Sequence, residues 1–166
     1  MNSKRIIKHL LVTNWQVRRT FSHSTMDAIG QAITASETSH SGEIRFAVEG
    51  ALDGLPLFKG QSARDRAIEV FSQLRMWDTQ HNNGVLIYVL LADQAVEIVA
   101  DRGIHTRAGM DEWRAICQQM ETAFSKADYK SGALKGIEAV TRSLNSHFPH
   151  QGKHVNELPD EPTLLT

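Results

Sequence analysis

The sequence has one cysteine, few aromatic residues and no excess of charge of either sign. The single cysteine, Cys117, excludes an internal disulfide. The chain has 18 lysines and arginines against 19 acidic residues, so it has no net positive charge to attract nucleic acid, and aromatic residues, at 7% of the chain, are too few for a base-stacking platform. No apolar run approaches the roughly 20 residues of a membrane span. We therefore expect a soluble protein of a reducing compartment, the cytoplasm, with no nucleic acid as partner.

The 166 residues suit one folded domain with short additions at both ends. We expect residues 1–39 to form an N-terminal helical extension and residues 40–148 to form an α/β domain. Residues 149–166 contain three of the four prolines, which interrupt regular structure, and are expected to form a flexible tail.

The N-terminal segment is basic and apolar at helical spacing. No acidic residue precedes Asp27, whereas the cations in this stretch are Lys4, Arg5, Lys8, Arg18 and Arg19. Lys8 and His9 split the apolar run, which is unlike a secretory signal. A short basic helix of this kind can lie on anionic lipid or dock its apolar side on its own domain. The docked helix is favoured, and a peripheral contact with a membrane surface stays open.

Two apolar runs in the middle of the chain predict the sheet. Residues 43–49 alternate apolar and polar side chains and predict a first strand, which a helix over about 62–77 connects to a second, residues 85–91. A right-handed crossover makes these two strands parallel. Residues 95–100 follow after a tight turn and predict an antiparallel third strand. The sequence thus predicts a small mixed sheet.

These strand directions bring polar residues to one edge of the sheet, where the first two strands begin and the third ends. Carboxylate and amide oxygens are the ligands that Ca²⁺ and Mg²⁺ prefer. The candidate metal ligands are Glu43, Asp78, Asn83, Asp101 and Asp111. The same residues can instead cap helices, shape turns or pair with arginine, so both interpretations stand at this stage.

Three segments carry a family resemblance. They resemble the TPM domain, which is shared by photosystem II repair proteins and many bacterial proteins. The segments are Asn83 to Tyr88, Val96 to Ile104, and Tyr129 to Leu134 with Gly136 and Ile137. The blocks Trp15 to Phe21 and Trp77 to Thr79 are similar to a cytoplasmic-type bacterial branch. The resemblance implies a three-layer α/β/α sandwich with a small central sheet. For some relatives it also implies calcium binding, acid phosphatase activity or maintenance of membrane complexes.

Two functions follow for this chain. In the favoured one, the domain is a binding or scaffold module, stabilised by a divalent cation, for an unidentified protein partner that can lie at a membrane surface. In the alternative, it is a metal-dependent phosphomonoesterase of the acid phosphatase kind, with Asp101 and Arg102 as candidate catalytic residues and Arg45 as a second phosphate-neutralising cation. The chain has no D-x-D pair for a phosphoryl nucleophile, which favours the binding module.

Overall fold

The computed structural model describes residues 3–153 and 155–166, so Met1, Asn2 and His154 of the expected extension and tail lie outside it. Within the described residues a four-stranded sheet has the order β3-β2-β1-β4. Its strands are β1 (Glu43–Glu49), β2 (Gly84–Leu90), β3 (Ala95–Ala100) and β4 (Thr163–Leu165). Strand β1 runs parallel to β2 and β4, and β3 runs antiparallel to β2. The predicted mixed sheet is confirmed, with one strand added.

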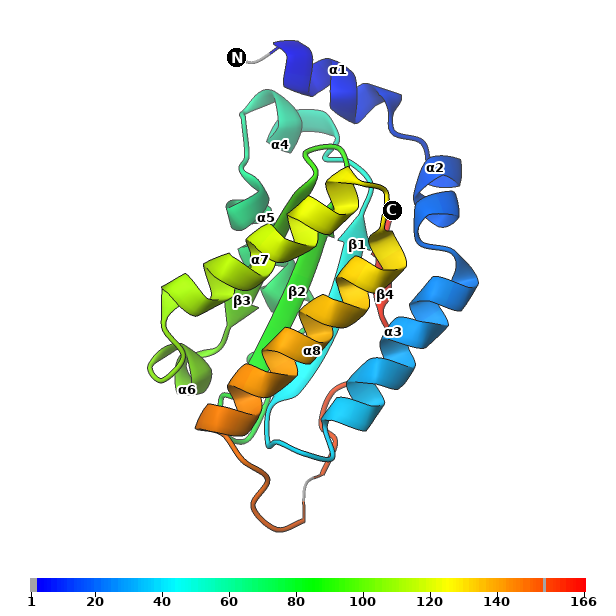
Figure 1. Cartoon of the computed structure of the whole chain (residues 1–166). Helices are drawn as coiled ribbons and strands as arrows, with labels where there is room; N and C mark the ends of the chain where they lie inside the picture. Colours follow the sequence, from blue (N-terminus) through cyan, green and yellow to red (C-terminus); the bar gives the residue numbers. More distant parts are fainter. Residues whose placement is uncertain (1–2, 154) are drawn as a thin grey trace.

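Helices cover both faces of this sheet (Figure 1). One layer consists of α3 (His23–Ser36), α7 (Met110–Ser125) and α8 (Tyr129–His147), and the opposite layer contains α4 (Gly54–Phe58) and α5 (Ala63–Gln73). All seven residues of β2 are buried, as expected for a central strand covered on both faces. Val85 and its alternate neighbours pack toward α7 and α8, whereas Leu86 and Tyr88 pack toward α5. The predicted three-layer α/β/α sandwich is confirmed.

Three further helices complete the described chain: α1 (Ser3–Leu11), α2 (Asn14–Thr20) and α6 (Arg102–His105). Helix α2 begins with a capping box, in which Thr13 and Gln16 exchange hydrogen bonds with each other's backbone N–H groups. Helices α1 and α4 lie at the end of the molecule where β1 and β2 finish, and α6 lies toward the opposite end (Figure 1). No helix among the described residues combines the length and apolar character needed to cross a bilayer.

Both ends of the described chain pack against the central domain more extensively than expected. Ile29 and Ile33 of α3, in the expected extension, are fully buried in the core. Thr163–Leu165, in the expected flexible tail, pair with Ala47–Glu49 of β1 as a parallel edge strand. Three residues are too short for an alternation pattern to reveal a strand, and the nearby prolines suggested only loop structure. The structure differs from the expected tail at these residues, and the domain boundaries at 40 and 149 stay predictions.

Candidate functional site

The edge where β1 and β2 begin and β3 ends brings three of the five candidate ligands together through their backbones. The Glu43 N–H donates to the Asn83 carbonyl oxygen at 3.0 Å, and the Asp101 N–H donates to the Gly84 carbonyl oxygen at 2.8 Å. Asn83 immediately precedes β2, and Asp101 immediately follows β3. Residues separated by as many as 58 positions in the chain thus share one sheet edge, because β1 and β2 are parallel and β3 returns antiparallel.

The side chains of Asn83 and Asp101 each bury one oxygen that has no hydrogen-bond partner among the described residues. Asp101 is 9% exposed and caps α6, since its Oδ1 accepts the Arg102 N–H at 2.7 Å, while its Oδ2 is unpartnered. Asn83 is 4% exposed and donates its amide N–H to the Ser41 carbonyl, while its Oδ1 is unpartnered. A buried acceptor without a partner costs about 1–3 kcal/mol, so a water or an ion is the expected complement.

Gly103 holds α6 against the loop that precedes β2. Its N–H donates to the Asn82 carbonyl oxygen at 3.0 Å. A Cβ atom at this position would lie 2.5 Å from the same oxygen and 2.7 Å from the His81 carbonyl oxygen, which no side chain tolerates. The absence of a side chain therefore lets the start of α6, and Asp101 with it, approach Asn83.

The other three candidate ligands have different surroundings. The fully buried Glu43 carboxylate accepts the backbone N–H groups of Glu157 and Leu158, each at 3.2 Å, and so holds the C-terminal segment. Asp78 is exposed. The side chain of Asp111 is 98% exposed and lies 3.6 Å from Arg114. Among the described residues no group of three or more His, Cys, Asp or Glu is placed to hold a metal ion, so the expected five-residue site does not assemble.

The two candidate phosphate-binding arginines have different surroundings. Arg102 is exposed directly beside Asp101. Arg45 is half-buried, and its guanidinium donates to Thr163 Oγ1 of β4 at 2.8 Å. Burial lowers the Arg45 pKa. Arg45 is therefore bound to the edge strand β4. Of these two arginines, Arg102 is the one exposed to bind an anion at the surface.

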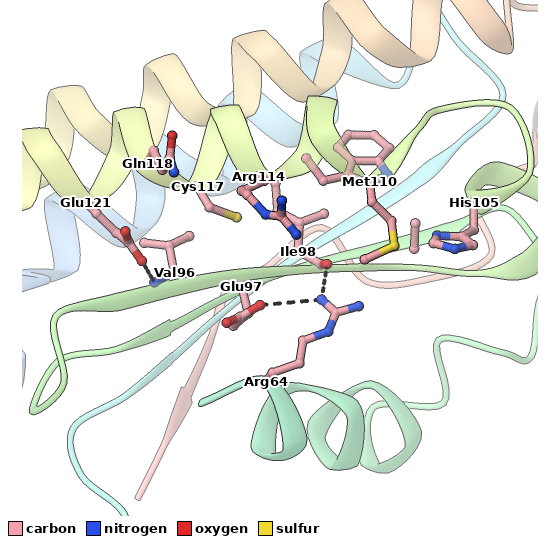
Figure 2. Close-up of a pocket in the computed structure, with 12 residues that line it drawn as sticks. Arg64, Val96, Glu97, Ile98, His105, Met110, Arg114, Cys117, Gln118 and Glu121 are labelled. Carbon is pink, nitrogen blue, oxygen red and sulfur yellow. Dashed lines mark hydrogen bonds and ion pairs between the residues drawn. The ribbon is translucent and has the colours of Figure 1, made fainter. Parts of the chain in front are cut away.

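A second candidate site, which the sequence did not predict, lies against the outer edge of β3. A cavity of about 390 Å³ opens between α5 and α7 (Figure 2). Glu121 of α7 accepts the Val96 N–H at 2.9 Å, and Arg64 of α5 donates to the Ile98 carbonyl oxygen. Arg64 also lies 3.5 Å from Glu97. These side chains satisfy outward-facing backbone groups that a neighbouring strand would otherwise bind.

The chemistry of this pocket suits binding rather than nucleophilic attack. Cys117 lines the pocket and is buried, which raises the pKa of its thiol to about 12 and leaves the thiol neutral at pH 7. Burial also raises the pKa of Glu97, against the lowering effect of Arg64. The indole Nε1 of Trp113 is a buried donor without a partner among the described residues. The pocket thus presents paired charges, from Arg64 and Glu97, but no activated nucleophile.

Comparison with known proteins places this architecture in a family. The model of the TPM domain matches residues 17–143. The chain belongs to the TPM domain family. The match starts in α2 and runs through α3, the sheet strands β1 to β3 and most of α8, so the TPM domain contains both the strand-end edge and the β3 pocket.

Solved structures show the same TPM fold. The NMR structure of the BA42 protein from the psychrophilic bacterium Bizionia argentinensis has a TM-score of 0.74 and 31% identity, over 86% of this chain and 94% of that one. The N-terminal domain of a P. gingivalis protein has a TM-score of 0.62 and 19% identity, over 86% and 95% of the two chains. The N-terminal domain of cg2496 from Corynebacterium glutamicum has a TM-score of 0.56 and 16% identity, over 81% of this chain and 79% of that one. No curated protein matched.

The β3 pocket of this TPM domain was missed because no local motif marks it. Arg64, Glu97 and Trp113 come from three different elements and meet only through the packing of α5 and α7 on an edge strand. The one usable signal was Glu97, a charged residue within an otherwise apolar strand. In the folded domain that charged side chain lines the wall of the cavity.

Proposed function

We propose that this TPM domain is a binding module stabilised by a divalent cation, Ca²⁺ or Mg²⁺, at the edge where β2 begins and β3 ends. The observation that carries the proposal is the pair of buried, unpartnered oxygens, Asn83 Oδ1 and Asp101 Oδ2. Both are hard donors of the kind these cations take, and backbone carbonyls and waters commonly complete such a shell. A cation there would offset the cost of burying two acceptors and would tie the end of β3 to the start of β2.

The β3 pocket supports binding as the task of the module. Arg64 and Glu121 are already hydrogen-bonded to the edge of β3, and the thiol of Cys117 is neutral at pH 7. We propose that an unidentified protein partner contributes the segment that fills this cavity. A cytoplasmic location belongs to the same proposal and is supported by the single, buried cysteine, which needs no oxidising compartment.

A phosphomonoesterase activity is the second candidate, and one observation favours it. The exposed Arg102 directly follows Asp101, so it can neutralise a phosphate that approaches the same edge. The cation, when bound, would polarise a phosphoryl oxygen. Of the residues expected for this activity, Asp101 and Arg102 are therefore retained in the proposal, and Arg45 is not.

Thermal melting of chelator-stripped protein with and without Ca²⁺ or Mg²⁺ tests the cation site. A ligand at about 100 times its Kd adds ~2.7 kcal/mol, which raises the melting temperature by several degrees at this size. We expect the Asp101→Asn variant to lose this rise while keeping its apo melting temperature, because Asn also caps helices well. Asp111→Asn, at a fully exposed carboxylate, is the matched control and should keep the rise.

Two outcomes would overturn the proposal. One is the absence of a shift with either cation, and the other is an equal shift in wild type and Asp101→Asn. Hydrolysis of p-nitrophenyl phosphate in the presence of the stabilising cation separates the two candidates. Activity that falls in Arg102→Ala would support the phosphomonoesterase, whereas a cation-induced shift without hydrolysis would support the binding module alone.

A further inference from the structure

Helix α1 is fastened to the domain by polar side chains. Arg5 donates from Nε to Asp93 Oδ1 at 3.0 Å, from Nη2 to Asp93 Oδ2 at 2.7 Å, and from Nη2 to the Gln61 carbonyl at 2.7 Å. His9 is 3% exposed, and its Nδ1 accepts the Leu52 N–H at 2.9 Å. Its Nε2 lies 3.0 Å from Asp93 Oδ1. The docked side of α1 is therefore largely polar.

The apolar side of α1 consequently faces solvent, which reverses the usual arrangement of a surface helix. Ile7 is 55% exposed, Leu10 69% and Leu11 67%, while Ile6 is half-buried against the domain. Lys4 and Lys8 are exposed on the same short helix. Nothing among the described residues covers this face.

Two neighbouring helices also carry exposed apolar side chains: α4, which lies at the same end of the molecule as α1, and α2, which follows α1 in the chain (Figure 1). Trp15 of α2 is exposed, as are Leu55 and Phe58 of α4. Six of the ten large apolar side chains that are exposed in the described residues belong to α1, α2 and α4. Single exposed apolar residues are ordinary, but such a concentration marks an interaction surface.

The charge around this surface is positive. The chain as a whole has a formal charge of −1, yet five cations and no acidic residue precede Asp27. Four of these cations are exposed, and the Arg19 guanidinium lies 5.3 Å from the centre of the Trp15 ring. Exposed leucine and tryptophan combined with lysine and arginine are typical of helices that lie in the interface of anionic membranes.

We propose that α1, with the adjoining apolar residues of α2 and α4, docks this domain on a bilayer that contains anionic phospholipid. The leucines would enter the boundary between headgroups and acyl chains, and the lysines and arginines would meet lipid phosphates. A second copy of this chain fits the surface poorly, because a symmetric contact would bring two basic segments together. The strand-end edge lies toward the far end of the sheet from α1 and would face away from the membrane (Figure 1).

Vesicle flotation tests this docking, with the full chain in chelator so that cation binding plays no part. We expect the protein to float with vesicles of phosphatidylcholine and phosphatidylserine and not with phosphatidylcholine alone, and raised salt should release it. The double variant Leu10→Glu/Leu11→Glu should lose flotation at an unchanged melting temperature, because both side chains are exposed. Val155→Glu, at another exposed apolar residue, is the control and should float like wild type.

Three results would overturn the proposal: no flotation of wild type, equal flotation of Leu10→Glu/Leu11→Glu, or equal binding to both kinds of vesicle. Light scattering after size exclusion adds a fourth. A wild-type dimer that the same double variant converts to monomer would assign the surface to self-association instead. None of these results depends on the cation site.

Discussion

The Arg5 guanidinium and the Asp93 carboxylate, 88 positions apart, form a two-point ion pair that fixes α1 to the turn between β2 and β3. This pair decides which side of α1 faces outward. Without it, the apolar side of the helix would be expected to turn toward the domain, as in most surface helices.

Removing the Arg5 side chain should loosen α1. We expect Arg5→Ala to lower the free energy of unfolding by about 1–3 kcal/mol, because it leaves a partly buried carboxylate without its main partner. Amides of α1 should also exchange faster with deuterium. Arg18→Ala, at an exposed arginine of the same basic segment, is the control. Unchanged exchange in α1 of Arg5→Ala would show that the ion pair does not hold the helix.

The same pair gives α1 a defined response to acid. Burial alone would raise the pKa of the Asp93 carboxyl. The hydrogen bonds from Arg5 and His9 lower this pKa by more than burial raises it, so it lies below its ordinary value of 3.8. A carboxyl with a lowered folded pKa stabilises above its unfolded pKa and loses that effect as the pH falls. We expect α1 to keep its protection from deuterium exchange down to pH 4 and to lose it below. Loss of protection already at pH 5 to 6 would contradict this assignment.

Glu37 should make the domain less stable as the pH rises from 4.5 to about 8. Burial raises its pKa from 4.5 to about 8, with help from the nearby Glu43 and Asp160, so the folded state keeps a proton that the unfolded chain releases. We expect the Glu37→Gln variant to lose this decline, so that between pH 4.5 and pH 8 its free energy of unfolding falls less than that of wild type, by on the order of a few kcal/mol. Denaturant unfolding across this pH range measures it, with exposed Glu138→Gln as control. The same decline in Glu37→Gln would exclude Glu37 as its source.

Glu121 should protect the edge of β3. The Glu121→Ala variant removes the acceptor of the Val96 N–H. We expect faster deuterium exchange at the Val96 amide and a loss of about 1 kcal/mol in the free energy of unfolding. Glu121→Gln keeps an acceptor oxygen and should restore most of the protection. If Gln and Ala behave alike, the hydrogen bond does not protect the edge.

Cys117 should react slowly with alkylating reagents in the folded protein. Its pKa is raised to about 12 by burial and by the nearby carboxylates of Glu97 and Glu121, so almost no thiolate is present at pH 8. We expect iodoacetamide to modify it readily only after unfolding, as followed by mass spectrometry. Rapid modification of the native protein would mean that the pocket activates this thiol.

The sequence predicted the parts of the fold that rest on strong periodicity. The strand over 43–49 and the buried run that begins at Val85 were recognisable because apolar side chains fill the positions that a covered sheet requires. Strand β4 was missed, because the three residues that follow Pro162 show no pattern and gain their structure only by pairing with β1.

The candidate site was predictable only to the level of the sheet edge. Strand directions located Asn83 and Asp101 at that edge, but side-chain placement decided the rest: Glu43 turned to the C-terminal segment, and Asp111 turned to solvent. The docking of α1 was predicted with its apolar side inward. The opposite holds because Asp93, in a distant turn, supplies a partner for Arg5 that local periodicity does not reveal.

The most direct test of the cation site is a residue-resolved one. Amide NMR spectra of ¹⁵N-labelled, chelator-stripped protein would be recorded during titration with Ca²⁺ and then with Mg²⁺. We expect the largest shifts at Asn83, Gly84 and Asp101 to Gly103, with α1 and the β3 pocket unaffected, and no such shifts in Asp101→Asn. Shifts centred on Asp111 or other exposed carboxylates, or none at all, would contradict a cation site at this edge of the sheet.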